Sequence, residues 1–408
     1  MLTVHPIDSL LRLPPSGPNP LYTYEESDKR LTSLHLERKE YHARKPKIEK
    51  SASTSISDAK KREGAPKLWK TPSTFAMSAL HSPWYTAMLR LQSTLIHTSV
   101  DFFNQCMGYR YVIVPMTTGS ISSPMGLGSD SQPVSIELAG TRTYLADSQQ
   151  FTLEYALRLE DGLKGAYYLG TSCRGEDPDA THLNQFCHVE CELLGELEDG
   201  MRVANEYVIA LVQAFKKNHR IEVERIAGTT KHLDDMLDLY QAHGNAFPMI
   251  TLDDALALPE MTENMWYYAV EGRPQYGRCL SRVGEQMLIA KFGGAVWLTE
   301  MDHMSVPFYQ AYAGDNRKAR CGDLLIGMGE VVGCGNRHET AEQALDALER
   351  HEVDPAEYDW YVEMRKVKEL NTTGWGIGSE RFLAWILQHD DIRDIQLLPR
   401  LKGMLCAP

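Results

Sequence analysis

The stretch that decides the fold lies near the carboxyl terminus and reads GWGIGSERFLAWILQHDDIRDIQLLPR, from Gly374 to Arg400. The alternating glycines at its start, from Gly374 to Gly378, predict a strand with one bare face that a flat ligand can approach. Apolar residues at helical spacing then predict a helix over 379–389. Arg381 enters this helix and can clamp a phosphate, which fits a nucleoside triphosphate. Taken alone the glycine pattern is weak, because such strands also occur at close packing points.

A second segment, residues 172–192, reads SCRGEDPDATHLNQFCHVECE. Runs 155–172 and 186–193 are predicted to be antiparallel strands joined by the intervening loop. Strand alternation places Phe186, His188, Glu190 and Glu192 on one face. An aromatic ring that can stack on a base therefore shares a face with carboxylates that can bind an ammonium group or a metal. The alternative is a half-exposed strand with one polar side.

Long apolar periodicities begin at about residue 76. They predict a buried helix that leads into a strand over 111–115, and further helices over 198–217 and 340–351, the last capped by Thr340. Residues 220–320 mix short strands and helices. Because the strands follow one another through hairpins and not through alternating βαβ units, we expect an α+β fold, an antiparallel β-sheet flanked by helices.

Residues 1–75 are expected to form an irregular basic arm, because Pro, Ser and like charges at this density cannot bury enough apolar surface to fold. Residues 29–70 hold thirteen Lys and Arg against five Asp and Glu, so the formal net charge of −13 leaves −21 on the rest of the chain. An acidic surface repels polyphosphates, which disfavours nucleic acid as a partner for most of this protein. The basic run is either a solvated linker or a contact for nucleic acid or another partner.

The composition, 43% apolar and 24% charged over 408 residues, is typical of a globular protein. No stretch approaches the roughly 18 apolar residues of a membrane helix, and the first residues lack a basic flank before an apolar run. We therefore expect a cytoplasmic protein without a membrane partner. The eight cysteines include no Cys-x-x-Cys pair and are expected to be reduced thiols.

The two segments, in this order, resemble motifs 2 and 3 of class II aminoacyl-tRNA synthetases, and most of all the eukaryotic type of asparaginyl-tRNA synthetase. The resemblance covers about residues 76–402 and includes YLADSQQFTLE at 144–154, PFYQ at 307–310, GEVVGCGNR at 329–337 and DWYVEMRK at 359–366. It implies the class II synthetase fold and an ATP-dependent ligase with its catalytic domain over 76–408. The helix and strand before Pro115 resemble motif 1, which implies a homodimer.

The resemblance also implies sites for ATP, Mg²⁺ and an amino acid. Arg174 would contact the α-phosphate, Arg381 the γ-phosphate and Glu330 the metal, and these three would be the catalytic residues. The implied ATP site consists of Arg174, Glu176, His182, Phe186, Glu330, Gly378 and Arg381. The implied amino-acid site consists of Ser148, Gln150, Glu154, His188, Glu190 and Arg337. In it, Gln150 and Glu190 would bind the ammonium group, and Arg337 would read the side-chain oxygen.

One position bears on the choice of amino acid. Leu153 stands where aspartate-specific relatives carry a lysine, and an acid, Glu154, follows it. Loss of the cation disfavours a carboxylate, and the added acceptor can accept from an amide NH₂. Asparagine is therefore the first choice and aspartate the second.

Two departures from the family concern tRNA. Fewer than about 80 residues precede motif 1, and they do not resemble the five strands of an anticodon-binding barrel. In the motif 2 loop, Asp177 and Asp179 stand where relatives carry arginines, which adds repulsion toward a phosphate backbone.

We therefore expect an asparaginyl or aspartyl adenylate whose acyl group passes to a small amine or other non-tRNA nucleophile, forming an amide. The alternatives are asparagine synthesis from aspartate and ammonia, a truncated synthetase that still charges tRNA, and a non-catalytic regulator. The joint retention of Arg174, Glu330 and Arg381 argues against the last.

Overall fold

The computed structural model describes residues 64–122 and 131–405, all of which belong to one unit, Ala52–Pro408. Its helices are η1 (Leu68–Lys70), α2 (Phe75–Leu80), α3 (Pro83–Asp101), η2 (Phe102–Met107), α4 (Gln150–Leu159), α5 (Leu197–Asn218), α6 (Arg220–Ala227), α7 (Lys231–Ala242), α8 (Leu252–Leu256), η3 (Glu263–Met265), η4 (Pro274–Tyr276), α9 (Arg282–Lys291), η5 (His303–Ser305), α10 (Ala341–Arg350), η6 (Pro355–Tyr358), α11 (Asp359–Val367), α12 (Ser379–Ile386) and η7 (Ile392–Asp394).

The strands are β1 (Arg110–Tyr111), β2 (Thr117–Thr118), β3 (Val134–Leu138), β4 (Thr141–Leu145), β5 (Gly165–Cys173), β6 (Gln185–Leu194), β7 (Met249–Thr251), β8 (Trp266–Tyr268), β9 (Arg278–Leu280), β10 (Ala295–Thr299), β11 (Tyr312–Ala313), β12 (Lys318–Ala319), β13 (Cys321–Ile326), β14 (Gly329–Asn336) and β15 (Thr372–Gly378). Eight of them form the central sheet in the order β1-β5-β6-β15-β14-β13-β10-β7. All its neighbours pair antiparallel except β1 with β5 and β10 with β7. The predicted α+β fold with a mainly antiparallel sheet is confirmed.

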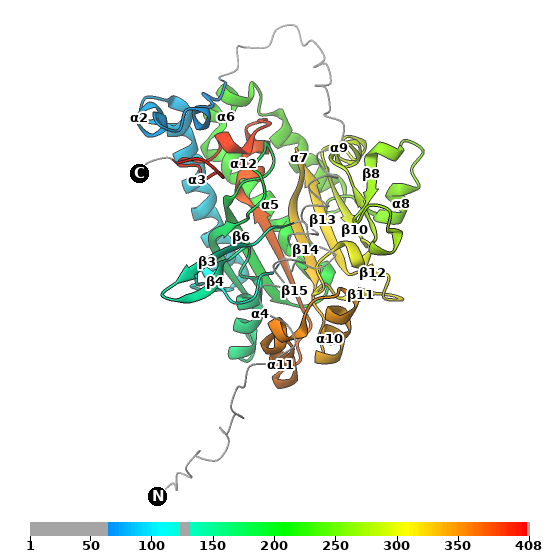
Figure 1. The fold of residues 1–408 in the computed structure, drawn as a ribbon. Coiled ribbons are helices and arrows are strands. Elements are labelled where there is room, and N and C mark those ends of the chain that lie inside the picture. Colours follow the sequence, from blue (N-terminus) through cyan, green and yellow to red (C-terminus); the bar gives the residue numbers. More distant parts are fainter. Residues whose placement is uncertain (1–63, 123–130, 406–408) are drawn as a thin grey trace, which may run out of the picture. The chain divides into compact units, whose positions relative to one another are not determined.

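Apolar side chains close one face of the sheet. Phe103, Tyr207 of α5 and Trp375 of β15 pack with ring centroids 5.2 to 5.7 Å apart, and each is nearly inaccessible to solvent. Burial of such large rings is a major part of core stability. Figure 1 shows α4, α10 and α11 together at one end of the sheet. Because this core covers one face of the sheet, the opposite, polar face is where a site is expected.

Several predicted elements match. The helix over 198–217 corresponds to α5, and the glycine-rich strand and its helix correspond to β15 and α12. Thr340 caps α10 as expected. Its side chain accepts from the Gln343 backbone amide, and the Gln343 side chain accepts from the Thr340 backbone amide.

Two predicted strands are corrected. Residues 155–159, read as the start of a strand, belong to helix α4, whose buried side chains, Phe151, Leu153, Glu154 and Leu157, recur at helical spacing. A five-residue window could not separate the two periods. The strand predicted over 111–115 is only β1, and it runs parallel to β5.

The boundary of the arm is also shifted. Residues 64–75 were assigned to it, but Trp69 Nε1 donates to Asp394 over 3.0 Å, and the Arg393 guanidinium lies 3.9 Å from the Trp69 ring centroid. The packed body therefore begins near Leu68. The rest of the predicted arm, residues 1–63, lies outside the described residues.

Candidate active site

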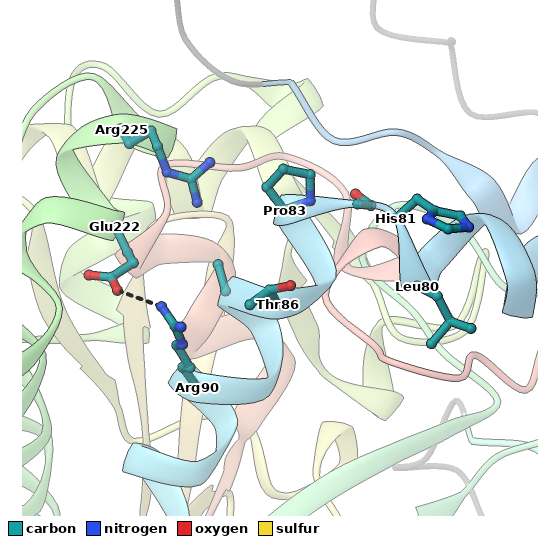
Figure 2. A pocket seen from close by; sticks show the side chains of 9 residues that line it. Leu80, His81, Pro83, Thr86, Arg90, Glu222 and Arg225 are labelled. Atoms are coloured by element: carbon teal, nitrogen blue, oxygen red, sulfur yellow. Dashed lines mark hydrogen bonds and ion pairs between the residues drawn. The ribbon is translucent and has the colours of Figure 1, made fainter.

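A surface pocket of about 340 Å³ lies between the start of α3 and helix α6 (Figure 2). Arg90 crosses it to reach Glu222 over 3.5 Å. None of the residues predicted for ATP or the amino acid lines this pocket. The candidate site is therefore the polar face of β6 and its neighbours.

The alternation predicted for β6 is confirmed. Val189 and Cys191 are buried in the main core, whereas Glu190 and Glu192 turn to the opposite face and meet polar partners there. Strand β15 pairs with β6 so that Gly378, Gly376 and Gly374 lie opposite His188, Glu190 and Glu192 in turn. The glycines therefore stand beside the functional side chains.

These glycines do different things. A Cβ at Gly374 would lie 1.7 Å from Glu192 Oε2, so the space there is filled by the protein's own side chains. At Gly378 the nearest such atom is 4.0 Å away, on Arg381. The predicted bare face is thus open at the Gly378 end and occupied at the Gly374 end.

The open end gathers the predicted phosphate ligands. Arg174 leaves the end of β5 with its guanidinium carbon 5.3 Å from the Phe186 ring centroid, and its Nε is buried without a hydrogen-bond partner. Arg381, in the first turn of α12, donates through Nη1 to the Glu330 carbonyl over 2.8 Å. Two cations and an aromatic ring therefore converge where ATP is expected.

The loop between β5 and β6 is folded on itself. Asn184 Nδ2 donates to the carbonyls of Arg174 and Glu176 over 3.0 and 2.6 Å. Asp179 accepts from the backbone amide and ring Nδ1 of His182 over 2.9 and 3.0 Å, and Asp177 pairs with Lys402 over 2.9 Å. Both acids that replace arginines thus have intramolecular partners. His182 and Glu176 contribute to the shape of the loop.

Sequence reasoning missed two acids beside Glu330. A Cβ at Gly333 would lie 2.9 Å from Glu330 Oε1 and 3.7 Å from Asp323 Oδ1, so both carboxylates lean over the same glycine. Burial, and then the charge of Glu330, raises the pKa of Glu285 to about 7 and that of Asp323 well above its usual range. Arg381, whose Nη1 lies 3.8 Å from Glu330 Oε2, offsets only part of this negative charge. Asp323 could have been found from its place on β13, the neighbour of the Glu330 strand.

This donor set fits Mg²⁺. In residues 64–122 and 131–405, no group of three or more His, Cys, Asp or Glu has the geometry to hold a metal alone. Mg²⁺ usually takes one or two carboxylates and completes its shell with phosphates and water. Glu330 and Asp323 would hold it, and its charge would relieve the repulsion among the acids.

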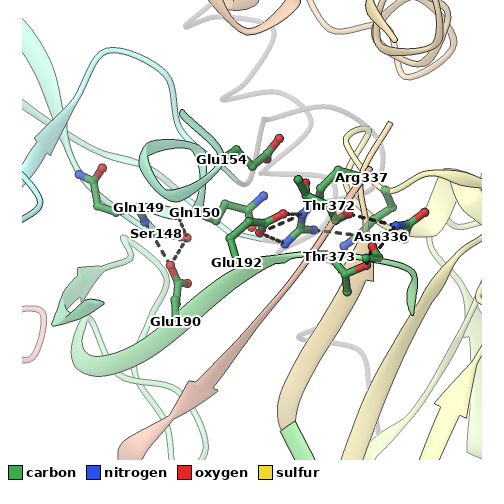
Figure 3. A network of polar contacts seen from close by, with 12 residues as sticks. Ser148, Gln149, Gln150, Glu154, Glu190, Glu192, Asn336, Arg337, Thr372 and Thr373 are labelled. Carbon is green, nitrogen blue, oxygen red and sulfur yellow. Dashed lines mark hydrogen bonds and ion pairs between the residues drawn. The ribbon is translucent and has the colours of Figure 1, made fainter. Parts of the chain in front are cut away.

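At the other end, Glu190 organises the predicted ammonium site (Figure 3). Ser148 Oγ donates to Glu190 Oε2 over 2.7 Å, and His188 Nδ1 lies 3.0 Å from Oε1. Burial opposes the effect, but His188, Tyr168 and Ser148 hold the pKa of Glu190 below its usual value. Gln150 Nε2 is buried without a partner. A fixed negative charge and a spare amide donor therefore lie together.

Arg337 forms a buried ion pair in the same network (Figure 3). Its Nε and Nη2 donate to Glu192 over 3.1 to 3.3 Å, and both side chains are at most 4% exposed. Burial raises the pKa of Glu192 to about 7, although Arg337 opposes the shift. The residue predicted to read the substrate side chain therefore carries its own counter-ion.

Glu154 differs from its predicted role. It is fully buried, and its carboxylate accepts from Arg365 Nη2 over 2.7 Å and from the Tyr361 hydroxyl over 3.0 Å. Because the pair is inaccessible, Glu154 supports the site from behind instead of facing a substrate amide. Arg365, which sequence reasoning did not single out, lies in the DWYVEMRK segment, 211 positions away.

Comparisons with known proteins show the family of the chain. Residues 71–402 match the family described as tRNA synthetases class II (D, K and N). An asparagine–tRNA ligase of Pyrococcus furiosus is 28% identical over 80% of this chain and 71% of its own, and one of Koribacter versatilis is 26% identical over 76% and 67%. The asparaginyl-tRNA synthetase of Pyrococcus horikoshii, solved with asparaginyl-adenylate, superposes with a TM-score of 0.71 at 24% identity, over 84% of this chain and 74% of that one.

Within the described residues, no helix is both long enough and apolar enough to cross a bilayer.

Proposed function

Because the chain belongs to the class II tRNA synthetases for aspartate, lysine and asparagine, we propose that it activates asparagine with ATP and passes the acyl group to a small amine. The chain is an ATP-dependent ligase related to asparaginyl-tRNA synthetase, of a family that uses ATP and Mg²⁺.

Activation joins the amino-acid carboxylate to the α-phosphorus of ATP and releases pyrophosphate. Arg174 would stabilise charge on the α-phosphate and Arg381 on the γ-phosphate, while Phe186 holds the base. Glu330 and Asp323 would hold Mg²⁺, which would supply further positive charge at the phosphates. These groups act by electrostatic stabilisation of the transition state. Removal of one such donor typically lowers the rate about 10²- to 10³-fold.

The observation that carries the choice of asparagine is the charge balance of the side-chain end. Arg337 pairs with Glu192, and Arg365 pairs with Glu154, each within 3.1 Å and almost without solvent. A substrate carboxylate would add an unpaired buried charge, which is costly, whereas a carboxamide adds none. This balance favours asparagine over aspartate.

The folded loop between β5 and β6 supports an acceptor other than tRNA. Asp177 and Asp179 bring negative charge to a loop that is held closed by Lys402 and His182. A protein gains affinity for a phosphate backbone when its cations displace counter-ions, and here the Lys402 ammonium is paired with Asp177. A small amine needs no such surface.

The relatives favour a second candidate, charging of tRNA, because those named here are asparagine–tRNA ligases. Synthesis of asparagine from aspartate and ammonia is the third.

Pyrophosphate exchange with each of the twenty amino acids tests the first step. Mass analysis of products with ammonia, small amines and total tRNA as acceptors separates the three outcomes. Asparagine-dependent exchange followed by efficient, salt-sensitive tRNA charging would replace our acceptor with tRNA.

The same proposal includes a homodimer. Tyr111, Ile113 and Met116, in and after β1, expose 49%, 90% and 76% of their surfaces. Contiguous exposed apolar residues on one edge are typical of an interface. Sedimentation at micromolar concentration tests it, and a monomer would contradict it.

A further inference from the structure

Gln310 lies against the residue proposed to read the substrate. Its Oε1 is 3.3 Å from Arg337 Nη1, and a backbone bridge joins the two residues. A guanidinium has only donors, so the oxygen of the Gln310 carboxamide must face Arg337 and its nitrogen must face away. Nε2 donates to none of the residues that the structure describes. Two N–H donors are therefore left beside Arg337.

Gly335 makes room for this arrangement. A Cβ at Gly335 would lie 1.6 Å from Gln310 Oε1, just as one at Gly374 would meet Glu192 and Arg337. Gly335 and Gly374 are paired on β14 and β15. Gln310, Arg337 and Glu192 thus lie across two adjacent bare positions of the sheet, as one layer.

A chain of two histidines holds Gln310 from behind. His303 Nε2 lies 2.7 Å from the Gln310 carbonyl, and His351 Nε2 lies 3.0 Å from His303 Nδ1. The carbonyl only accepts, so His303 carries its proton on Nε2, and its Nδ1 must accept from His351. Both rings are at most 1% exposed. These bonds have one direction and leave the Gln310 backbone little freedom.

We propose that Gln310 is a specificity-determining residue, which fixes Arg337 through its oxygen and offers its N–H donors to the side-chain oxygen of the amino acid. His303 and His351 are its positioning residues. The inference rests on the proposed adenylation of an amino acid. The Gln310 amide is a neutral donor in a pocket whose charges are already balanced. Such a donor suits the oxygen of a carboxamide.

Two substitutions at Gln310 separate its hydrogen bond to Arg337 from its proposed hydrogen bond to the substrate. Q310M removes both, and Q310E keeps an oxygen toward Arg337 but replaces the N–H donors with negative charge. In pyrophosphate exchange we expect each variant to raise the KM for asparagine about tenfold, with the KM for ATP unchanged, since one hydrogen bond to a ligand is worth roughly that factor. A normal KM in Q310E would reduce Gln310 to a support for Arg337 and overturn the proposal.

The histidine chain is tested with H303Q and H303L. The Gln side chain can keep a donor near the position of Nε2, so H303Q should stay within about threefold of the wild-type KM for asparagine, whereas H303L should raise it. Because His303 is buried, the KM for ATP and the thermal unfolding curve serve as controls for folding. Equal KM values in H303Q and H303L would overturn the positioning role.

The outcomes also separate this inference from the proposed function. If wild-type protein supports no exchange with any amino acid, the proposed function fails and the inference fails with it. If exchange occurs and Q310M leaves the KM for asparagine unchanged, only the inference fails.

Discussion

The two ends of strand β6 are built in opposite ways. At the Phe186 end, Arg174 Nε has no partner, Arg381 donates to the backbone carbonyls of Thr181 and Glu330, and Gly378 faces open space. At the Glu192 end, charges are paired, buried and packed over bare glycines. ATP brings its own negative charge, so an end that binds it needs cations that are not fully neutralised by buried carboxylates. An end that selects a neutral side chain must be neutral before the substrate arrives.

The largest expected effect comes from breaking a buried ion pair at the Glu192 end of β6. R365A leaves Glu154 buried without its cation, and removing one partner of a buried pair typically costs about 3–5 kcal/mol. We expect a loss of this size in the free energy of unfolding, measured in urea. The double variant E154Q/R365M, which removes both charges, should recover much of it. A double variant as unstable as R365A would refute the charge explanation.

The next effect concerns the Phe186 end of β6. R381A and E330Q are each expected to lower pyrophosphate exchange at least about 10²- to 10³-fold. Unfolding of E330Q should match the wild type or improve on it, because the charge of Glu330 raises the pKa of Glu285.

R90A, at the pocket of Figure 2, is the matched control and should exchange normally. Near-normal exchange in R381A or E330Q would place the active site elsewhere.

A pH series sharpens the comparison. Burial raises the pKa of Glu192 to about 7, so the group is protonated below that pH and ionised above it. As the pH falls through about 7, the Arg337 charge loses its counter-ion and the pocket becomes positive. The ratio of kcat/KM for aspartate to that for asparagine should therefore rise at low pH, by up to about tenfold for each pH unit. In E192Q the ratio should be high and should vary little with pH.

The smallest effect concerns the loop between β5 and β6. The Asp177–Lys402 pair is exposed, and such pairs contribute about 0–1 kcal/mol. D177K should therefore leave both unfolding and asparagine-dependent exchange nearly unchanged. It should raise affinity for tRNA at low salt if the acid excludes RNA. Asp179 is unsuitable for this test, because it shapes the loop through His182.

Much of the site followed from sequence. The face of β6 and the cap of α10 each depend on spacing along one segment, and both segments have the expected geometry. The strand predicted at 155–159 was wrong because five residues can satisfy both the helical and the strand period, whereas α4 continues to Leu159 and becomes extended only at Glu160. The space over Gly374 was misjudged because its occupant, Glu192, comes from another strand.

By itself the sequence determined the fold class, the family resemblance and the order of side chains along the site, because strand alternation and motif spacing are local properties of the chain. Only the tertiary structure decided which charges cancel. Arg365 meets Glu154 across 211 positions, Lys402 meets Asp177 across 225, and Arg337 meets Glu192 across 145. Whether a buried cation is free for a substrate or already neutralised depends on which strands and helices become neighbours, and this is set by packing of the whole chain.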